Sequence, residues 1–473
     1  MNTITESPGQ YWPVSRKYDT VDRKYKFFEA THAYQLEEYY PLKKKLDHIS
    51  YSSSEVNATS LKSQNAVGSE MYIDGFTTDS NVRKTSQYLR KLCIDCSVPL
   101  PSTEVNALFD ICFPNVIHLD IGSFMEMNTT LLGKLSNCFP NVETLHMEKI
   151  ERSSSCDNEE EWEKTLKMLF EDESIFPKVQ NFFVGDVMKY CPAGDPKLPA
   201  YKRPLNLLHI YKGTPYIDFR NIRISPWQST LTELHLGYHI ENNGIEYIGH
   251  LHNLKVFSWG LSLYTFDEEF AHIKNLYNLE ELRVFFGGED CNISAEGLIT
   301  LFTLPEKEPE KSFPYKLKHL IMANYYEGSV DLFKAIDRNC PNLITLGLPF
   351  NDYLTFYDGV MPLIVSHFKH LVFLDLSNFG NCYKDEVWSN LSDDDLPDLR
   401  LLKLHGNKTN IENLQRLNLK RPKLLISNKP NYFINWTKTK NACIFHDTFD
   451  GDIEAVVNDL RQVDGLRDFS ISF

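Results

Sequence analysis

Two nearly identical stretches decide the fold: CFPNVIHLDI at residues 112–121 and CFPNVETLHM at residues 138–147. Their first cysteines, Cys112 and Cys138, are separated by the same interval as their central leucines, Leu119 and Leu145. In both, an apolar residue is followed by Leu three positions later and by Ile or Met two positions after that. A stretch that recurs at one spacing predicts a repeat architecture.

The same L-x-x-L-x-L spacing continues along most of the chain. Most intervals between copies are about 23–28 residues, in the 20–29 residue range of leucine-rich repeats, and two longer intervals hold insertions at 151–164 and 304–316. A set of unrelated amphipathic strands would not share one period. Copies begin at Leu89, Val116, Val142, Val179, Leu231, Leu254, Leu279, Leu317, Leu343, Leu371, Leu399 and Leu466, with weaker copies at 205–210 and around Leu424.

The pattern has a simple physical reading. The leucines of each copy face inward from a short strand, and the rest of the unit returns over the other side, because parallel strands need a crossover. One unit cannot bury its apolar side alone, so units must stack. We therefore predict an α/β leucine-rich-repeat solenoid: a curved horseshoe with a parallel β-sheet on the concave face and helices on the convex face. About a dozen repeats fill 87–473, and 1–86 form an irregular or helical N-terminal cap.

Helices are expected between the strands, at 128–138, 242–254, 294–304 and 328–340. The CFPN sequence is the joint between units. Cys112, Cys138 and Cys340 are expected to end helices as small buried thiols. The proline that follows stops the helix, and the asparagine after it tolerates turn conformations.

Composition narrows the functional classes. Among the 473 residues, Lys plus Arg number 49 and Asp plus Glu number 64, which gives a net charge of −15. This charge argues against nucleic acid or an anionic membrane as the main partner. No apolar run approaches the roughly 20 residues that a membrane-spanning helix needs, and the N-terminus does not resemble a signal peptide. Ten cysteines without secretion indicate reduced thiols and a cytoplasmic or nuclear protein.

The sequence gives little support for an enzyme or a cofactor. It contains no glycine-rich phosphate loop, no GxSxG and no HExxH. The single CxxC, Cys93 to Cys96, cannot make a four-ligand zinc site by itself. Cys93, Asp120 and His146 share one column of outward positions and are metal-ligand types, but no fourth ligand is evident. We expect no enzyme activity, no metal and no cofactor.

The outward positions of the strands predict a protein-binding surface on the concave face. They combine histidine, acidic, basic and aromatic side chains, a mixture that suits protein recognition. The candidate residues are His118, Asp120, His146, Glu148, Glu233, His235, Glu281, Arg283, Phe285, His319, Phe373, Asp375, Lys403 and His405. The acidic insertion at 151–164 is expected to be a flexible loop, and a phosphorylated loop is the alternative.

The CFPN joints, with helices of the types GI-x-x-I and EGL-x-x-L, resemble the cysteine-containing class of leucine-rich repeats. That class is typical of F-box/leucine-rich-repeat proteins, and the abundance of Asn, Lys, Tyr and Phe resembles the fungal type. The resemblance covers 87–473. In that family an N-terminal F-box docks on an adaptor of cullin–RING ubiquitin ligases. Residues 1–86 contain no Leu-Pro-x-Glu start of an F-box; the helix predicted at 24–46 is a simple cap or a degenerate F-box remnant.

The resemblance implies protein recognition, with substrate selection for a cullin–RING ligase in the Ubl conjugation pathway as the sharper hypothesis. A ligase-independent adaptor or inhibitor with the same repeats is the alternative. A regulator of GTPases is a third, and it requires a positioning residue at a strand edge that the sequence does not identify.

Overall fold

The three-dimensional description comes from a computed structural model. It describes residues 70–73, 89–94, 112–121, 125–152, 159–186, 202–210, 217–236, 242–261, 265–286, 292–325, 329–351, 359–379, 384, 386–404, 406–421, 424–429 and 432–434. The helix predicted at 24–46 and the last predicted repeat, which starts at Leu466, lie outside these residues. Within the described residues, no helix has both the length and the apolar character needed to cross a bilayer.

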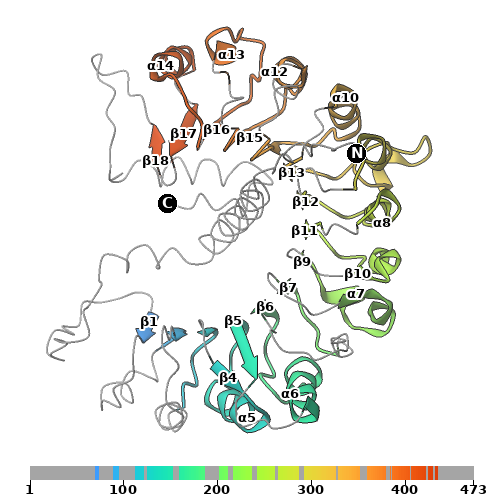
Figure 1. Ribbon diagram of the computed structural model, residues 1–473, viewed down its shortest axis with the longest axis vertical. Helices are drawn as coiled ribbons and strands as arrows, with labels where there is room; N and C mark the ends of the chain where they lie inside the picture. The colour runs from blue at the N-terminus through green and yellow to red at the C-terminus, as the bar shows by residue number, and fades with distance from the viewer. Residues whose placement is uncertain are drawn as a thin grey trace, which may run out of the picture. The chain divides into compact units, whose positions relative to one another are not determined.

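One sheet runs through the described residues, and its strands follow each other in chain order (Figure 1). Neighbouring strands are parallel up to the last pair, which is antiparallel. Helices lie on the outer side of the strands (Figure 1). In order, the strands are β1 (Glu70–Ile73), β2 (Lys91–Ile94), β3 (His118–Ile121), β5 (Thr144–Arg152), β6 (Asn181–Asp186), β7 (Leu207–Ile210), β9 (Glu233–Leu236), β11 (Val256–Gly260), β12 (Glu281–Phe285), β13 (His319–Ala323), β14 (Thr345–Gly347), β15 (Phe373–Asp375), β16 (Leu401–Lys403), β17 (Leu425–Lys429) and β18 (Tyr432–Ile434).

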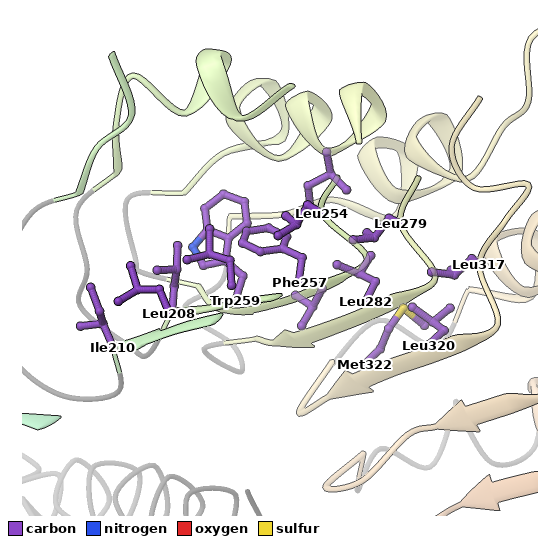
Figure 2. Close-up of a cluster of buried hydrophobic side chains, with 14 of the residues drawn as sticks. Leu208, Ile210, Leu254, Phe257, Trp259, Leu279, Leu282, Leu317, Leu320 and Met322 are labelled. Carbon is purple, nitrogen blue, oxygen red and sulfur yellow. The ribbon is translucent and has the colours of Figure 1, made fainter. Parts of the chain in front are cut away.

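The repeat leucines pair with one another across this sheet. Leu119 is level with Leu145, and farther along Leu346 is level with Leu374. All four are buried. Figure 2 shows the same alignment in the middle of the array, where Phe257, Leu282 and Leu320 form one inward row. The predicted leucine-rich-repeat solenoid is confirmed, and the weaker copies at 205–210 and around Leu424 are strands β7 and β17 of the same sheet.

The strands are connected by helices of two kinds. Some units contain an α-helix of seven residues or more, such as α5 (Thr129–Cys138), α10 (Val330–Asn339) and α12 (Met361–His367). The shorter units between Leu231 and Leu279 turn back through 3₁₀-helices, η2 (Ile245–His250) and η3 (Ala271–Asn275). A 3₁₀-helix rises about 2.0 Å per residue against about 1.5 Å for an α-helix, so fewer residues cover the same distance. The helix predicted at 242–254 is therefore of the 3₁₀ type.

Two of the other predicted helices begin at a capping side chain. Asn128 caps α5, because its side-chain oxygen accepts the Leu131 amide at 2.8 Å. Ser294 caps α9 (Ala295–Leu301) in the same way, through the Gly297 amide at 3.0 Å. Both are expected roles for short polar side chains at a helix start.

The insertion at 151–164 differs from the prediction of a flexible loop. Its second half begins α6 (Glu159–Glu171), and Trp162 on that helix is 3% exposed. Burying an indole in the core stabilises the folded protein more than leaving it in a solvated loop. Because the residues before Trp162 are acidic, the sequence analysis did not predict this helix.

The joints are tied to one another by asparagine side chains. Asn141 donates from its amide nitrogen to the carbonyl of Pro114 in the preceding unit at 2.6 Å. Asn278 makes the same bond to the His252 carbonyl at 2.7 Å, and Asn342 to the Tyr315 carbonyl at 2.7 Å. The asparagine therefore satisfies a backbone acceptor that no helix or strand reaches, a role beyond the turn conformation that the sequence predicts.

Two joints without this asparagine use an arginine. The guanidinium of Arg203 donates to the carbonyls of Asp172 and Phe176 at 2.6 and 3.1 Å. Arg421 does the same for Leu396 and Ser392 at 2.7 and 2.9 Å. Phe176 and Leu396 both adopt left-handed backbone conformations, with φ of 48° and 43°. A fork of donors suits such a turn because it satisfies several carbonyls at once.

The cysteines at the joints are buried in only two of the three predicted cases. Cys138 and Cys340 are buried, whereas Cys112 is exposed. The prediction for Cys112 is therefore wrong. Burial raises the pKa of the Cys340 thiol far above its ordinary value, with nearby Asp337 adding to the effect.

A leucine truncation tests the stacking of units. Leu346 is fully buried in the middle of the sheet. We expect Leu346→Ala to lower the free energy of unfolding by about 2–5 kcal/mol, because it leaves a cavity between two units. Urea unfolding followed by circular dichroism measures the loss. Leu419→Ala is the matched control: its side chain is 69% exposed, so we expect a change within about 0.5 kcal/mol. Equal effects would contradict the shared core.

Thiol labelling tests the joints. We expect Cys112 to react with a maleimide in the native protein and Cys340 to react only after unfolding, because a buried thiol with a raised pKa supplies almost no thiolate. Peptide mapping by mass spectrometry reads out each site. Fast native labelling of Cys340 would contradict the closed joint.

Candidate protein-binding surface

The inner face of the sheet carries a column of residues from the middle of successive strands, β3 to β16. Strand register aligns each member with the next, because every neighbouring pair is parallel and in step. Strands lie about 4.8 Å apart, so adjacent members of the column are neighbours in space. The column is Asp120, His146, Phe183, His209, His235, Ser258, Arg283, Ile321, Gly347, Asp375 and Lys403.

The first part of the column is a run of histidine and phenylalanine rings. His146 Nδ1 lies 2.5 Å from Asp120 Oδ1. Its ring meets Phe183 edge-on, with centroids 6.0 Å apart. His209 then contacts Phe183 at 5.8 Å and His235 at 5.0 Å. Aromatic contacts of this kind hold the rings in fixed positions.

Phe183 and His209 were missed by the sequence prediction. They lie on β6 and β7, in the copy that begins at Val179 and the weaker copy at 205–210, and only the alignment of strands assigns them to the column. The histidine just before an inward Ile in LNLLHI was the available signal for His209.

The middle part of the surface is a buried cluster of opposite charges. Arg283 Nε contacts the Glu281 carboxylate on the same strand, and the two side chains are 7% and 9% exposed. His319 Nδ1 lies 2.9 Å from Thr345 Oγ1 on the next strand. His235 Nε2 lies 3.8 Å from Glu233 Oε2. Burial alone raises the pKa of Glu281, but Arg283, His319 and His235 outweigh it and hold that pKa below its ordinary value.

The last part of the column holds a second charge pair. Lys403 Nζ lies 3.7 Å from Asp375 Oδ2. The other oxygen of Asp375 accepts from the backbone amide and the hydroxyl of Ser377, at 2.9 and 2.6 Å. The carboxylate is therefore fixed by its own strand end and faces the lysine.

The predicted surface residues differ in exposure. The structure buries Asp120, His146, His235, Glu281, Arg283, His319, Phe373 and Asp375, leaves Glu233, Phe285 and Lys403 half-buried, and exposes His118. The side chain of Glu148, the whole of His405 and the side chain of Cys93 lie outside the described residues. This face is therefore less exposed than its polar composition suggests.

The polar groups of this face pair mainly with one another. Along the described strands they form ion pairs and hydrogen bonds, and one of these joins the Thr345 hydroxyl to the His319 imidazole. Among the residues that the structure describes, no three His, Cys, Asp or Glu side chains converge as a metal site.

Comparisons with known proteins find similarity at the level of solved structures only. No protein-family model matches the chain, and no curated protein matches it. An internalin from Listeria monocytogenes aligns with 15% identity over 77% of this chain and 87% of its own, at a TM-score of 0.38. A chain from the yeast complex of Rad7 and Elc1 aligns with 15% identity over 88% of this chain and 98% of its own, also at a TM-score of 0.38. A leucine-rich-repeat protein from Leptospira interrogans aligns with 14% identity over 76% of this chain and 89% of its own, at a TM-score of 0.28.

The buried charge pair makes a stability prediction. Arg283→Ala leaves the Glu281 carboxylate buried without its nearest cation, and we expect it to lower the free energy of unfolding by about 3–5 kcal/mol. The double variant Glu281→Gln with Arg283→Gln leaves no such charge, so we expect it to lose less. Urea titration of both variants checks the order. A single variant as stable as the double one would contradict the pairing.

Glu281 also predicts a response to acid. Because its pKa is lower in the folded protein than in the unfolded chain, its contribution to stability is present above the unfolded value, near 4.5, and is lost as pH falls through the folded value. We therefore expect Glu281→Gln to flatten the fall in stability below about pH 5. Urea midpoints measured from pH 7 to pH 3 test this, and parallel curves for wild type and variant would contradict it.

Proposed function

We propose that this chain is a protein-recognition scaffold and that the inner face of its sheet holds the partner. The observation that carries this proposal is the buried Glu281–Arg283 pair with His235 and His319 beside it. The solenoid needs only the leucines on the core side of its sheet to stack. Burying charges on the opposite side, the inner face of the sheet, costs free energy that apolar side chains would avoid. A requirement for specific recognition accounts for keeping them.

The chemistry of the face favours a protein as partner. Arginine and aromatic side chains are the residue types that anchor protein interfaces most strongly. Phe285 follows Arg283 by two positions on β12 and is half-buried, so its ring adjoins the charge cluster while part of it stays open. Fixed charge pairs select a partner of complementary charge and disfavour others.

We further propose that the recognised protein is a substrate for a cullin–RING ubiquitin ligase. Support for this step comes from the cysteine-containing joints, which resemble those of F-box/leucine-rich-repeat proteins. In this proposal residues 1–86 carry the contact to the ligase adaptor, and 87–473 carry the substrate. A ligase-independent adaptor, inhibitor or GTPase regulator is the alternative for the same repeats.

Affinity purification of the tagged full chain separates these possibilities. We expect a protein partner whose recovery falls roughly tenfold with Phe285→Ala, because an interface anchor contributes at least about 1.4 kcal/mol. Phe266→Ala is the matched control, since Phe266 is an exposed aromatic at the start of an outer helix. Circular dichroism confirms that both variants fold.

The outcomes distinguish the levels of the proposal. A partner retained equally by both variants would overturn binding at the inner face. Recovery of a cullin adaptor that is lost on deleting 1–86 supports ligase membership. A stable partner without any cullin adaptor supports the ligase-independent reading, and stimulated GTP hydrolysis by that partner would identify the regulator.

A further inference from the structure

A second surface lies at the joints of the short repeats, between the 3₁₀-helices and the strands that follow them. Four aromatic rings form a row there: Tyr247 contacts His250 at 6.0 Å, His250 contacts His252 at 6.2 Å, and His252 contacts Tyr277 at 6.3 Å between centroids. We call this row the joint strip. His252 and Tyr277 are exposed, and the other two rings are half-buried.

The joint strip arises from a change at one repeat position. Where other joints carry Pro114, Pro140 or Pro341, two successive short repeats carry His252 and Tyr277. The alignment is set by the asparagine that follows: Asn141 and Asn342 follow proline, whereas Asn253 and Asn278 follow the rings. These last two asparagines also bond back to the preceding unit, to the carbonyls of Ser229 and His252, at 2.6 and 2.7 Å. The rings are therefore carried on a fixed backbone.

Close packing of the 3₁₀-helices holds the rings near one another. A Cβ atom at Gly249 would lie 2.5 Å from the Cβ atom of Asn275, so only glycine allows this approach of η2 to η3. His250 follows Gly249 directly, and Tyr277 follows Asn275 by two positions. The spacing of the strip is thus built into the short repeats.

Basic side chains lie against one ring of the joint strip and close to the joint residues in sequence. The guanidinium carbon of Arg223 lies 5.4 Å from the centre of the Tyr247 ring. Lys255 and Lys318 share a single carboxylate, Glu280, at 3.4 and 3.0 Å. Lys316 donates to the side chain of Asn278, next to Tyr277, at 2.7 Å. These four basic side chains outnumber the acidic ones beside them, Glu280 and the exposed Glu246 next to Tyr247.

The fold does not need these exposed rings, because proline serves the same position in other joints. Large exposed aromatic groups bordered by cations are typical of binding surfaces. Ring centroids about 6 Å apart match the advance of roughly 6.6 Å over two residues of an extended chain. An extended segment can therefore place alternate side chains on successive rings and the intervening ones toward the lysines.

From this arrangement we propose that the joint strip binds an extended acidic segment of a partner protein. Aromatic or apolar side chains of the segment stack on the rings, and its carboxylates pair with Arg223, Lys255 and Lys318. Single-stranded nucleic acid also stacks on aromatic groups, and it is an alternative occupant that the experiment below tests directly. This surface is separate from the inner face, so the proposal does not depend on what that face binds.

Fluorescence anisotropy with the full chain tests the proposal. The probe is a labelled peptide of about 12 residues that alternates glutamate with tyrosine, long enough to cover the strip. Comparison probes are a lysine–tyrosine peptide of the same length and an oligothymidylate of matching length. We expect the acidic peptide to bind best and to bind less tightly as salt rises, because exposed charges are screened.

Variants locate the site. We expect Tyr277→Ala to weaken binding of the acidic peptide roughly fivefold or more, and Lys255→Ala with Lys318→Ala to do the same. Leu419→Ala, which removes an exposed apolar side chain elsewhere, leaves binding unchanged. No binding of the acidic peptide at millimolar concentration, equal binding by wild type and Tyr277→Ala, or preference for either comparison probe would overturn the proposal. Circular dichroism establishes that each variant remains folded.

Discussion

Each unit of this protein presents an apolar side that it cannot bury alone, and the rest of the structure depends on that constraint. The in-register leucines of β14 and β15 are fully buried only because the two strands lie side by side. Hydrophobic burial has no direction of its own. Backbone pairing between parallel strands supplies the direction, and together they allow the array to grow one unit at a time. The strand register also sets the spacing of the side chains on the inner face.

Stacking also leaves backbone carbonyls at the joints outside any helix or strand, and leucine side chains cannot donate hydrogen bonds to them. Asparagine donates these bonds at Asn141, Asn278 and Asn342, and arginine donates them at Arg203 and Arg421. The two solutions differ in reach. An asparagine amide satisfies one carbonyl of the previous unit, whereas a guanidinium reaches two or more and accompanies turns with a left-handed residue. Joints therefore tolerate variation in sequence as long as one donor remains.

The sequence predicted the repeats well because leucine spacing reports the core directly. It could not predict which polar side chains would be buried, since Glu281 and Arg283 protect each other and His319, which adds to that protection, belongs to the next strand of the sheet. It also missed Phe183 and His209, which become neighbours only through strand register. The exposed Cys112 and the buried Trp162 show the same limit: a local pattern does not reveal what the neighbouring unit covers.

The connecting helices link the fold to its surfaces. Some units return through an α-helix, as in α5 and α10. A shorter unit turns back through a 3₁₀-helix, as in η2 and η3, and brings neighbouring joints close enough for their side chains to touch. In such units a ring at the proline position meets a ring of the next unit instead of standing alone. Rings at the proline position of two consecutive units therefore add an exposed surface to their joints, while the leucines in the core of the same units keep their register.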